Sequence, residues 1–160
     1  MYRARDIAAW LINRDNREPD EHKKNHEYIT ILKLMKLLYY AQGAFLAIDG
    51  VKLFDEPIEA WEYGPVVPEV YNIFKDVQAY EIKDHVGLLQ GREIDGETEE
   101  LLEQVYAEIG LRYTASELVT KTHRETPWLK ATDGGVLLNR QRIKLEDMKE
   151  YFKEYYTESI

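Results

Sequence analysis

The chain has 160 residues, of which 44% are hydrophobic and 12% aromatic, and its formal net charge is −9 at pH 7. A chain of this length can bury a sizeable core, so we expect a single domain over residues 1–160. The hydrophobic content excludes a disordered acidic chain. Because proteins contact nucleic acid phosphates through Lys and Arg, the negative charge argues against direct nucleic acid binding.

The sequence offers no sign of export or membrane insertion. It contains no cysteine, so we expect neither disulfides nor thiolate chemistry. It has no uninterrupted apolar run close to 18 residues, and we therefore expect no membrane-spanning segment. Residues 1–6 lack the apolar core and the small-residue cleavage site of a signal peptide. These features favour a cytoplasmic protein.

Hydrophobic periodicity predicts helices in the first third of the chain. Apolar residues recur at helical spacing up to about Asn13, and the polar residues 14–28 are predicted to form a loop. Thr30 is a suitable N-cap for a long helix over about residues 30–48. Because this helix is apolar on most sides, we expect it to be buried at the centre of the domain. Its less apolar face carries Lys33, Lys36, Tyr40 and Gly43. A glycine inside a helix lowers stability by about 1 kcal/mol relative to alanine. The close approach of a neighbouring backbone would explain why a glycine stands at position 43.

Two small hairpins are predicted next to the central helix. One would pair residues 51–54 with 58–63 around a turn at 55–57, and the other would lie within 136–143. A Gly64–Pro65 turn would then lead into a helix that begins at Pro68, because proline suits the first helical position.

The remaining signals predict further helices. Apolar periodicity marks residues 101–109 and 148–155, and Thr114 with Glu117 forms a capping box, whereas residues 79–96 show no clear pattern. The fold class is therefore mainly α (α+β): a compact multi-helix domain around a buried central helix, with one or two small β-hairpins.

Candidate catalytic and metal-binding residues are few. His22 and His26 have the spacing of a helical metal pair, but two lysines lie between them and no glutamate follows the first histidine. His123 and Glu125 could act as an acid–base pair, yet residues two apart on a helix point in different directions. A structural role for His123, bonding a backbone group or packing on Trp128, is the better interpretation. No serine elbow and no glycine-rich nucleotide loop is present, so we expect no catalytic residue, no metal and no cofactor.

The richest concentration of rigid residues lies at the corner formed by residues 58–71. Aromatic residues at a tight turn usually complete a core, but Trp and Tyr also dominate binding hot spots. A loop ordered in advance by glycine and proline loses less entropy on binding. We expect a mixed outcome, with Trp61 and Val66 buried and Tyr63 and Tyr71 partly exposed.

The sequence resembles the Panacea domain family, which includes SocA-like antitoxins and phage-associated GepA-type proteins. The resemblance covers most of the chain from the first helix onward, and its motifs are fairly specific only when taken together. The first motif, at residues 34–42, contains Lys36-Leu37-Leu38-Tyr39, and the second, at 58–71, contains Ala60-Trp61 and Tyr63-Gly64-Pro65-Val66. The other matching segments are residues 118–123, 126–128 and 143–152.

The resemblance implies a small helical domain that acts as a non-enzymatic protein-binding module. An antitoxin that neutralises a toxin, or an adaptor that delivers a toxin to a Clp-type protease, is the function it implies. The acidic chain would suit a basic toxin. The residues carried over as fold and interface determinants are Lys36, Tyr40, Trp61, Tyr63, Gly64, Pro65, Val66, Val67, Pro68, Tyr71, His123 and Trp128.

Two other functions remain open at the level of the sequence. One is a phage- or prophage-associated structural or regulatory protein, which would use the domain for assembly. The other is a hydrolase-type enzyme with His123 at its centre, which requires a concave pocket around that residue. The sequence also leaves the oligomeric state open.

Overall fold

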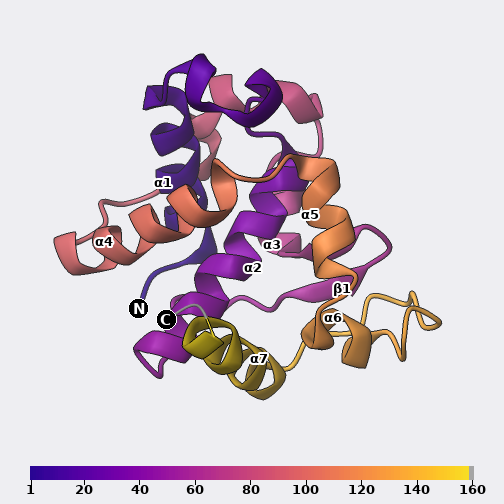
Figure 1. Cartoon of the computed structure of the whole chain (residues 1–160). Helices are drawn as coiled ribbons and strands as arrows, with labels where there is room; N and C mark the ends of the chain where they lie inside the picture. The colour runs from indigo at the N-terminus through magenta and orange to yellow at the C-terminus, as the bar shows by residue number, and fades with distance from the viewer. Residues whose placement is uncertain (159–160) are drawn as a thin grey trace.

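A long central helix, α2 (Ile31–Ile48), organises the computed structural model, which describes residues 1–158 (Figure 1). Thr30 caps the helix, because its hydroxyl accepts a hydrogen bond from the Lys33 backbone N–H at 3.3 Å. Most of α2 is buried. The helices packed on it are α1 (Ala4–Arg17), α4 (Gly96–Val105), α5 (Ala115–Thr122) and α7 (Leu145–Glu158). The predicted mainly α fold around a central helix at residues 30–48 is confirmed.

Helix α2 is also long and apolar enough to cross a membrane, with a mean hydropathy of 1.3 over 18 residues. In this structure 78% of that stretch is buried against the rest of the domain, as expected for a core helix. The sequence-based expectation overlooked the stretch because Lys33 and Lys36 interrupt its apolar residues. Both lysines are buried.

The polar segment after α1 is tied to the core. Helix α1 continues past its predicted end, and two 3-10 turns follow it, η1 (Asp20–His22) and η2 (Lys24–His26). The buried Asp15 carboxylate accepts a hydrogen bond from the Tyr106 hydroxyl at 2.7 Å and lies 3.5 Å from Lys23 Nζ. The predicted loop is therefore partly helical and anchored by a buried carboxylate.

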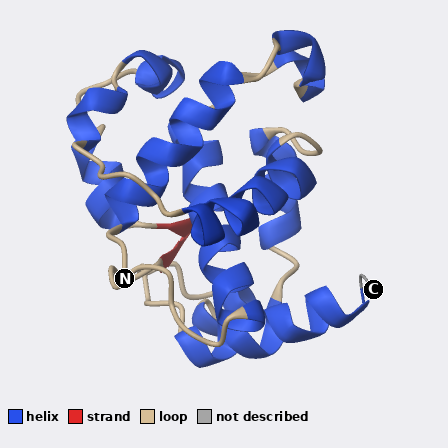
Figure 2. Ribbon diagram, turned by 90° about the vertical axis from the view of Figure 1, so that its left-hand side faces the viewer, coloured by secondary structure: helices blue, strands red, loops and turns tan. Residues whose placement is uncertain are grey.

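A small antiparallel sheet lies among the helices (Figure 2). Strand β1 (Glu59–Trp61) pairs with β2 (Gly64–Val66), so residues 62–63 form the turn. The predicted strand at residues 58–63 is present in part, but the turn predicted at Gly64 is instead the start of the second strand.

The predicted pairing of residues 51–54 with this strand is wrong. The Gln42 side chain binds the backbone there, since its Oε1 accepts from the Leu53 N–H at 2.7 Å and its Nε2 donates to the Phe54 carbonyl at 2.8 Å. The Tyr2 N–H donates to the Leu53 carbonyl at 3.1 Å. These bonds satisfy the polar backbone groups that a hairpin would have paired.

The hairpin predicted within residues 136–143 is wrong as well. Residues 141–143 run along the free edge of β1, where the Ala60 N–H donates to the Gln141 carbonyl at 2.8 Å. The segment before α7 thus covers an edge that would otherwise be open.

The other elements follow their local signals. Pro68 is the first residue of α3, and the Thr114–Glu117 capping box opens α5, both as predicted. The remaining elements are α3 (Pro68–Ile73), η3 (Ala79–Asp84), η4 (Val86–Leu89), η5 (Tyr106–Gly110), which continues α4 as a π-helical turn, and α6 (Thr126–Ala131).

Gly43 in α2 lets helix α7 approach, as its position inside a helix suggested. The close neighbour is a side chain and not a backbone, because a Cβ on Gly43 would lie 2.2 Å from Phe152 Cδ2. The Phe152 ring in turn packs edge-on against Tyr39 and Tyr40, with centroid distances of 5.3 and 5.8 Å. The glycine is therefore required for the contact between these two helices.

Candidate protein-binding site

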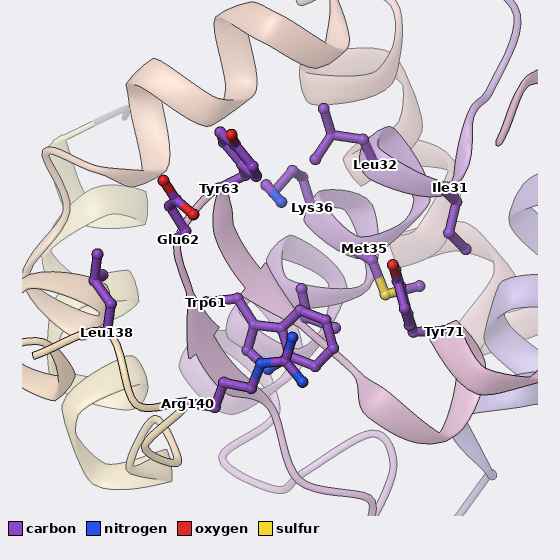
Figure 3. A pocket seen from close by; sticks show the side chains of 11 residues that line it. Ile31, Leu32, Met35, Lys36, Trp61, Glu62, Tyr63, Tyr71, Leu138 and Arg140 are labelled. Carbon is purple, nitrogen blue, oxygen red and sulfur yellow. The ribbon is translucent and has the colours of Figure 1, made fainter. Parts of the chain in front are cut away.

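A pocket of about 420 Å³ opens where α2, the hairpin, α3 and the loop before α7 meet (Figure 3). Five residues predicted from the 34–42 and 58–71 motifs line it together: Lys36, Trp61, Tyr63, Val66 and Tyr71. Its other lining residues are Ile31, Leu32, Met35, Glu62, Leu138 and Arg140. The fold thus gathers residues far apart in the sequence around one concave, largely apolar site.

Exposed aromatic rings form the rim of this pocket. Tyr63 is 62% exposed and Tyr71 37% exposed, which agrees with the expectation from the sequence. Trp61 was expected to be buried but is only half-buried. Its indole packs edge-on against Tyr71, with 5.0 Å between ring centroids, and the Arg140 guanidinium stacks 3.7 Å above it. Trp61 and Tyr71 thus hold one another and remain partly open to solvent, and Tyr63 is mostly open, as is common for aromatic side chains at protein interfaces.

Lys36 lies at the inner end of the pocket. The side chain is buried, and its Nζ donates a hydrogen bond to the Pro65 carbonyl at 3.3 Å. Burial lowers the pKa of this amine to about 7. Gly64 makes the space for it, because a Cβ there would lie 2.6 Å from Lys36 Cε, and the backbone φ of +109° also favours glycine.

His123 and Trp128 hold the hairpin from behind. His123 Nε2 lies 2.8 Å from the Glu62 carbonyl, and Trp128 Nε1 donates to the Trp61 carbonyl at 2.9 Å. The two rings stack with 4.2 Å between their centroids. Both features of the predicted structural role for His123, a backbone bond and packing on Trp128, are confirmed. His123 does not line this pocket.

Glu125 points away from His123 and has its own partners in the core. It accepts hydrogen bonds from the hydroxyls of Tyr39 and Tyr40 and from Lys121 Nζ, each at 2.9 Å. Burial, reinforced by the negative charge of Glu125, raises the pKa of each of these tyrosines well above the ordinary value for tyrosine. Tyr40 was expected to be one of the residues of a partner-binding surface, but it is a core residue.

The other motif residues shape the hairpin instead of facing solvent. Gly64, Pro65 and Val67 are buried, and Pro68 only begins the helix behind them. The Val67 N–H points at Met35 Sδ, 3.4 Å away. These residues position the exposed rings of the pocket.

The sequence analysis missed the contribution of the last loop to the pocket and the supporting role of Glu125. Leu138 and Arg140 lie on the loop before α7, in which Val136 is 76% exposed. The apolar residues that follow two glycines there were the signal that could have indicated this loop. Glu125 was considered only as a catalytic group. Two adjacent tyrosines in an apolar helix were a signal that a buried acceptor is needed.

The residues that the structure describes contain no group of three or more His, Asp or Glu side chains able to hold a metal ion. His22 Nδ1 lies 2.9 Å from Glu18 on the surface instead of sharing a site with His26.

Comparison with known proteins identifies the family. The family model described as "Antitoxin SocA-like, Panacea domain" matches residues 34–129, which include Met35 and Lys36 of α2 and the pocket's hairpin and α3 residues. The curated protein Antitoxin SocA of Caulobacter vibrioides (strain NA1000 / CB15N) is 37% identical over 110 residues, which cover 62% of this chain. The chain spans 58% of the length of that relative. No solved structure matches the chain. The protein belongs to the SocA-like antitoxin, Panacea domain family.

Proposed function

We propose that this protein is an antitoxin that neutralises a protein toxin by binding it through the aromatic pocket, without catalysing a reaction. The observation that carries the proposal is that Trp61, Tyr63 and Tyr71, three residues of the family-matched segment, gather around one open pocket. The similar protein from Caulobacter vibrioides is named an antitoxin, which supports the same role here.

The rim of the pocket has the chemistry of a binding hot spot. Trp, Tyr and Arg are the residues most enriched at such spots, and Trp61, Tyr63, Tyr71 and Arg140 all line this pocket. The hairpin is fixed by His123 and Trp128, so little entropy is lost when a partner docks. An ordered, half-open aromatic surface of this kind supports binding better than it supports chemistry.

The overall charge indicates the kind of toxin. A net charge of −9 would attract a basic partner and would speed its encounter with the antitoxin. We therefore infer that the toxin is basic, as proteins that act on RNA commonly are.

The test is co-expression of this chain with the product of the adjacent gene, scored by growth and by co-purification. Rescue of a toxic neighbour together with a stable complex is the expected outcome. A toxic neighbour that this chain neither rescues nor binds would overturn the proposal.

The same assay separates two ways of neutralising the toxin. If the antitoxin blocks a working surface of the toxin, rescue persists in a host that lacks Clp-type proteases. If it is a proteolytic adaptor, rescue disappears in that host while the complex still forms. We propose occlusion, because the pocket and its rim offer a continuous contact surface.

A further inference from the structure

Lys36 is a buried cation for which the fold supplies no negative partner. Among the ion pairs within residues 1–158, none involves Lys36, and its one hydrogen bond goes to a neutral carbonyl. The buried Lys23 is paired with Asp15 at 3.5 Å and the half-buried Lys121 with Glu125 at 2.9 Å. In the described part of the chain the buried Lys33 has no ion pair within 4 Å, but the negative charges of Glu27 and Asp15 act on it, whereas no such charge acts on Lys36. An ammonium group has three donors, so Lys36 retains unused hydrogen-bonding capacity.

A role in folding alone does not explain this lysine. An unpaired buried charge is destabilising, whereas methionine would fill the same space against Gly64 and Met35 without a charge. The amine lies where the hairpin meets α2, beside Tyr63 in the close-up view (Figure 3). An unpaired donor at the inner end of an open pocket is the arrangement expected of a site that receives an anion.

We propose that this pocket receives an acidic side chain, Asp or Glu, carried on an apolar segment of the toxin, and that its carboxylate pairs with Lys36. The proposal rests on the antitoxin function given above. Ile31, Leu32 and Met35 line the α2 wall and would take the apolar neighbours of that acidic residue.

The charged groups around the pocket agree with this occupant. Arg140 lines the mouth and adds a second positive charge, and Glu62, which also lines the pocket, contributes one negative charge, so two positive groups stand against one carboxylate. The pocket is thus a local cationic point on a chain with net charge −9. The overall field would attract a basic toxin, and one acidic residue of the toxin would then fix how it docks.

The test uses two acetylated and amidated peptides, Leu-Ala-Glu-Leu-Phe and Leu-Ala-Gln-Leu-Phe, titrated into the isotopically labelled full chain and followed by NMR. We expect the Glu peptide to bind at least about tenfold more tightly at pH 6, since a charge-assisted bond replaces a neutral one. The shifts should map to the Trp61 indole and to the backbone of Tyr63 and Tyr71. Lys36→Met should remove the difference between the peptides while its NMR spectrum stays that of a folded protein.

Measuring both peptide affinities at several pH values distinguishes a charge effect of Lys36 from an effect of its packing, because packing alone would not depend on pH. The preference for the Glu peptide should decrease between pH 6 and pH 9, as Lys36 loses its proton. Equal affinity for the two peptides on the unmodified chain, or no binding of either at millimolar concentration, would overturn the proposal. That result would leave growth rescue untouched, so the failure of this inference can be told apart from the failure of the antitoxin function.

Discussion

Replacing Lys36 with methionine changes how the stability of the protein depends on pH. Burial lowers the pKa of Lys36 from 10.5 to about 7 in the folded protein, while the unfolded chain keeps the ordinary value. Between these two pH values the unfolded chain binds a proton that the folded protein does not. The free energy of unfolding contributed by this group is therefore fully present above about pH 10.5, and is lost as the pH falls to about 7.

The size of the effect follows from the shift. One pKa unit corresponds to about 1.4 kcal/mol, so Lys36 weakens the fold by roughly 5 kcal/mol at neutral pH relative to high pH. Between about pH 7 and pH 9 the change is roughly 3 kcal/mol, a large part of the stability of an ordinary domain. Methionine cannot titrate and loses only the 3.3 Å hydrogen bond to the Pro65 carbonyl.

The assay is urea unfolding of the unmodified protein and of Lys36→Met at several pH values, with the exposed Lys75→Met as the matched control. Lys36→Met should be the more stable protein at pH 7, and its advantage should shrink by roughly 3 kcal/mol up to about pH 9. Lys75→Met should follow the unmodified protein throughout. A stability difference between Lys36→Met and the unmodified protein that does not change with pH would refute the assignment of a buried, unpaired amine.

Three further substitutions test the fold by urea unfolding. Gly43→Ala should destabilise the protein by roughly 1–3 kcal/mol despite the better helix propensity of alanine, because its Cβ would overlap the Phe152 ring, 2.2 Å away. Gly96→Ala, where no atom lies within 4 Å of the new Cβ, is the control and should change stability little. Glu125→Ala should cost roughly 3–5 kcal/mol, since it leaves two buried hydroxyls and a lysine without their acceptor, and a loss below 1 kcal/mol would contradict the network. Thr114→Ala should cost about 1 kcal/mol through the lost cap of α5, and an unchanged unfolding midpoint would argue against it.

Elements with a strong local signal could be predicted from the sequence. The central helix has both a long apolar pattern and a capping threonine, Thr30, and the fifth helix has a complete capping box at Thr114. Pro68 marks the start of α3 for an equally local reason, because proline lacks an N–H that would need a partner. In these places the residues nearest in sequence decide the backbone.

The hairpins were mispredicted because residues distant in the sequence determine the hydrogen-bond partners of these segments. The pattern of residues 51–54 is typical of a strand, but the side chain of Gln42 binds their backbone instead. The segment 141–143 joins β1 across a separation of some 80 residues in sequence, for which no local pattern exists. Pairing of this kind follows from how the helices bring segments together.

The candidate site was predictable in its residues and not in its geometry. The sequence singled out Trp61, Tyr63 and Tyr71 because such residues are rare together at a tight corner. It could not show that Lys36 turns inward, because lysines usually extend to solvent, nor that Arg140 lies over Trp61. Both placements depend on packing between α2, the hairpin and the last loop.

The central claim is that the aromatic rim of the pocket binds the toxin, and the most direct measurement is the affinity of the toxin for rim variants. The double variant Tyr63→Ala/Tyr71→Ala should bind at least about a hundredfold more weakly than the unmodified protein and should fail to rescue growth. The variant should stay folded, with only a modest fall in its urea midpoint, because Tyr63 is largely exposed and Tyr71 loses one ring contact, with Trp61. The control Tyr80→Ala removes a tyrosine that is 62% exposed and does not line the pocket, and it should bind as the unmodified protein does. Full affinity and full rescue by the double variant would contradict the claim.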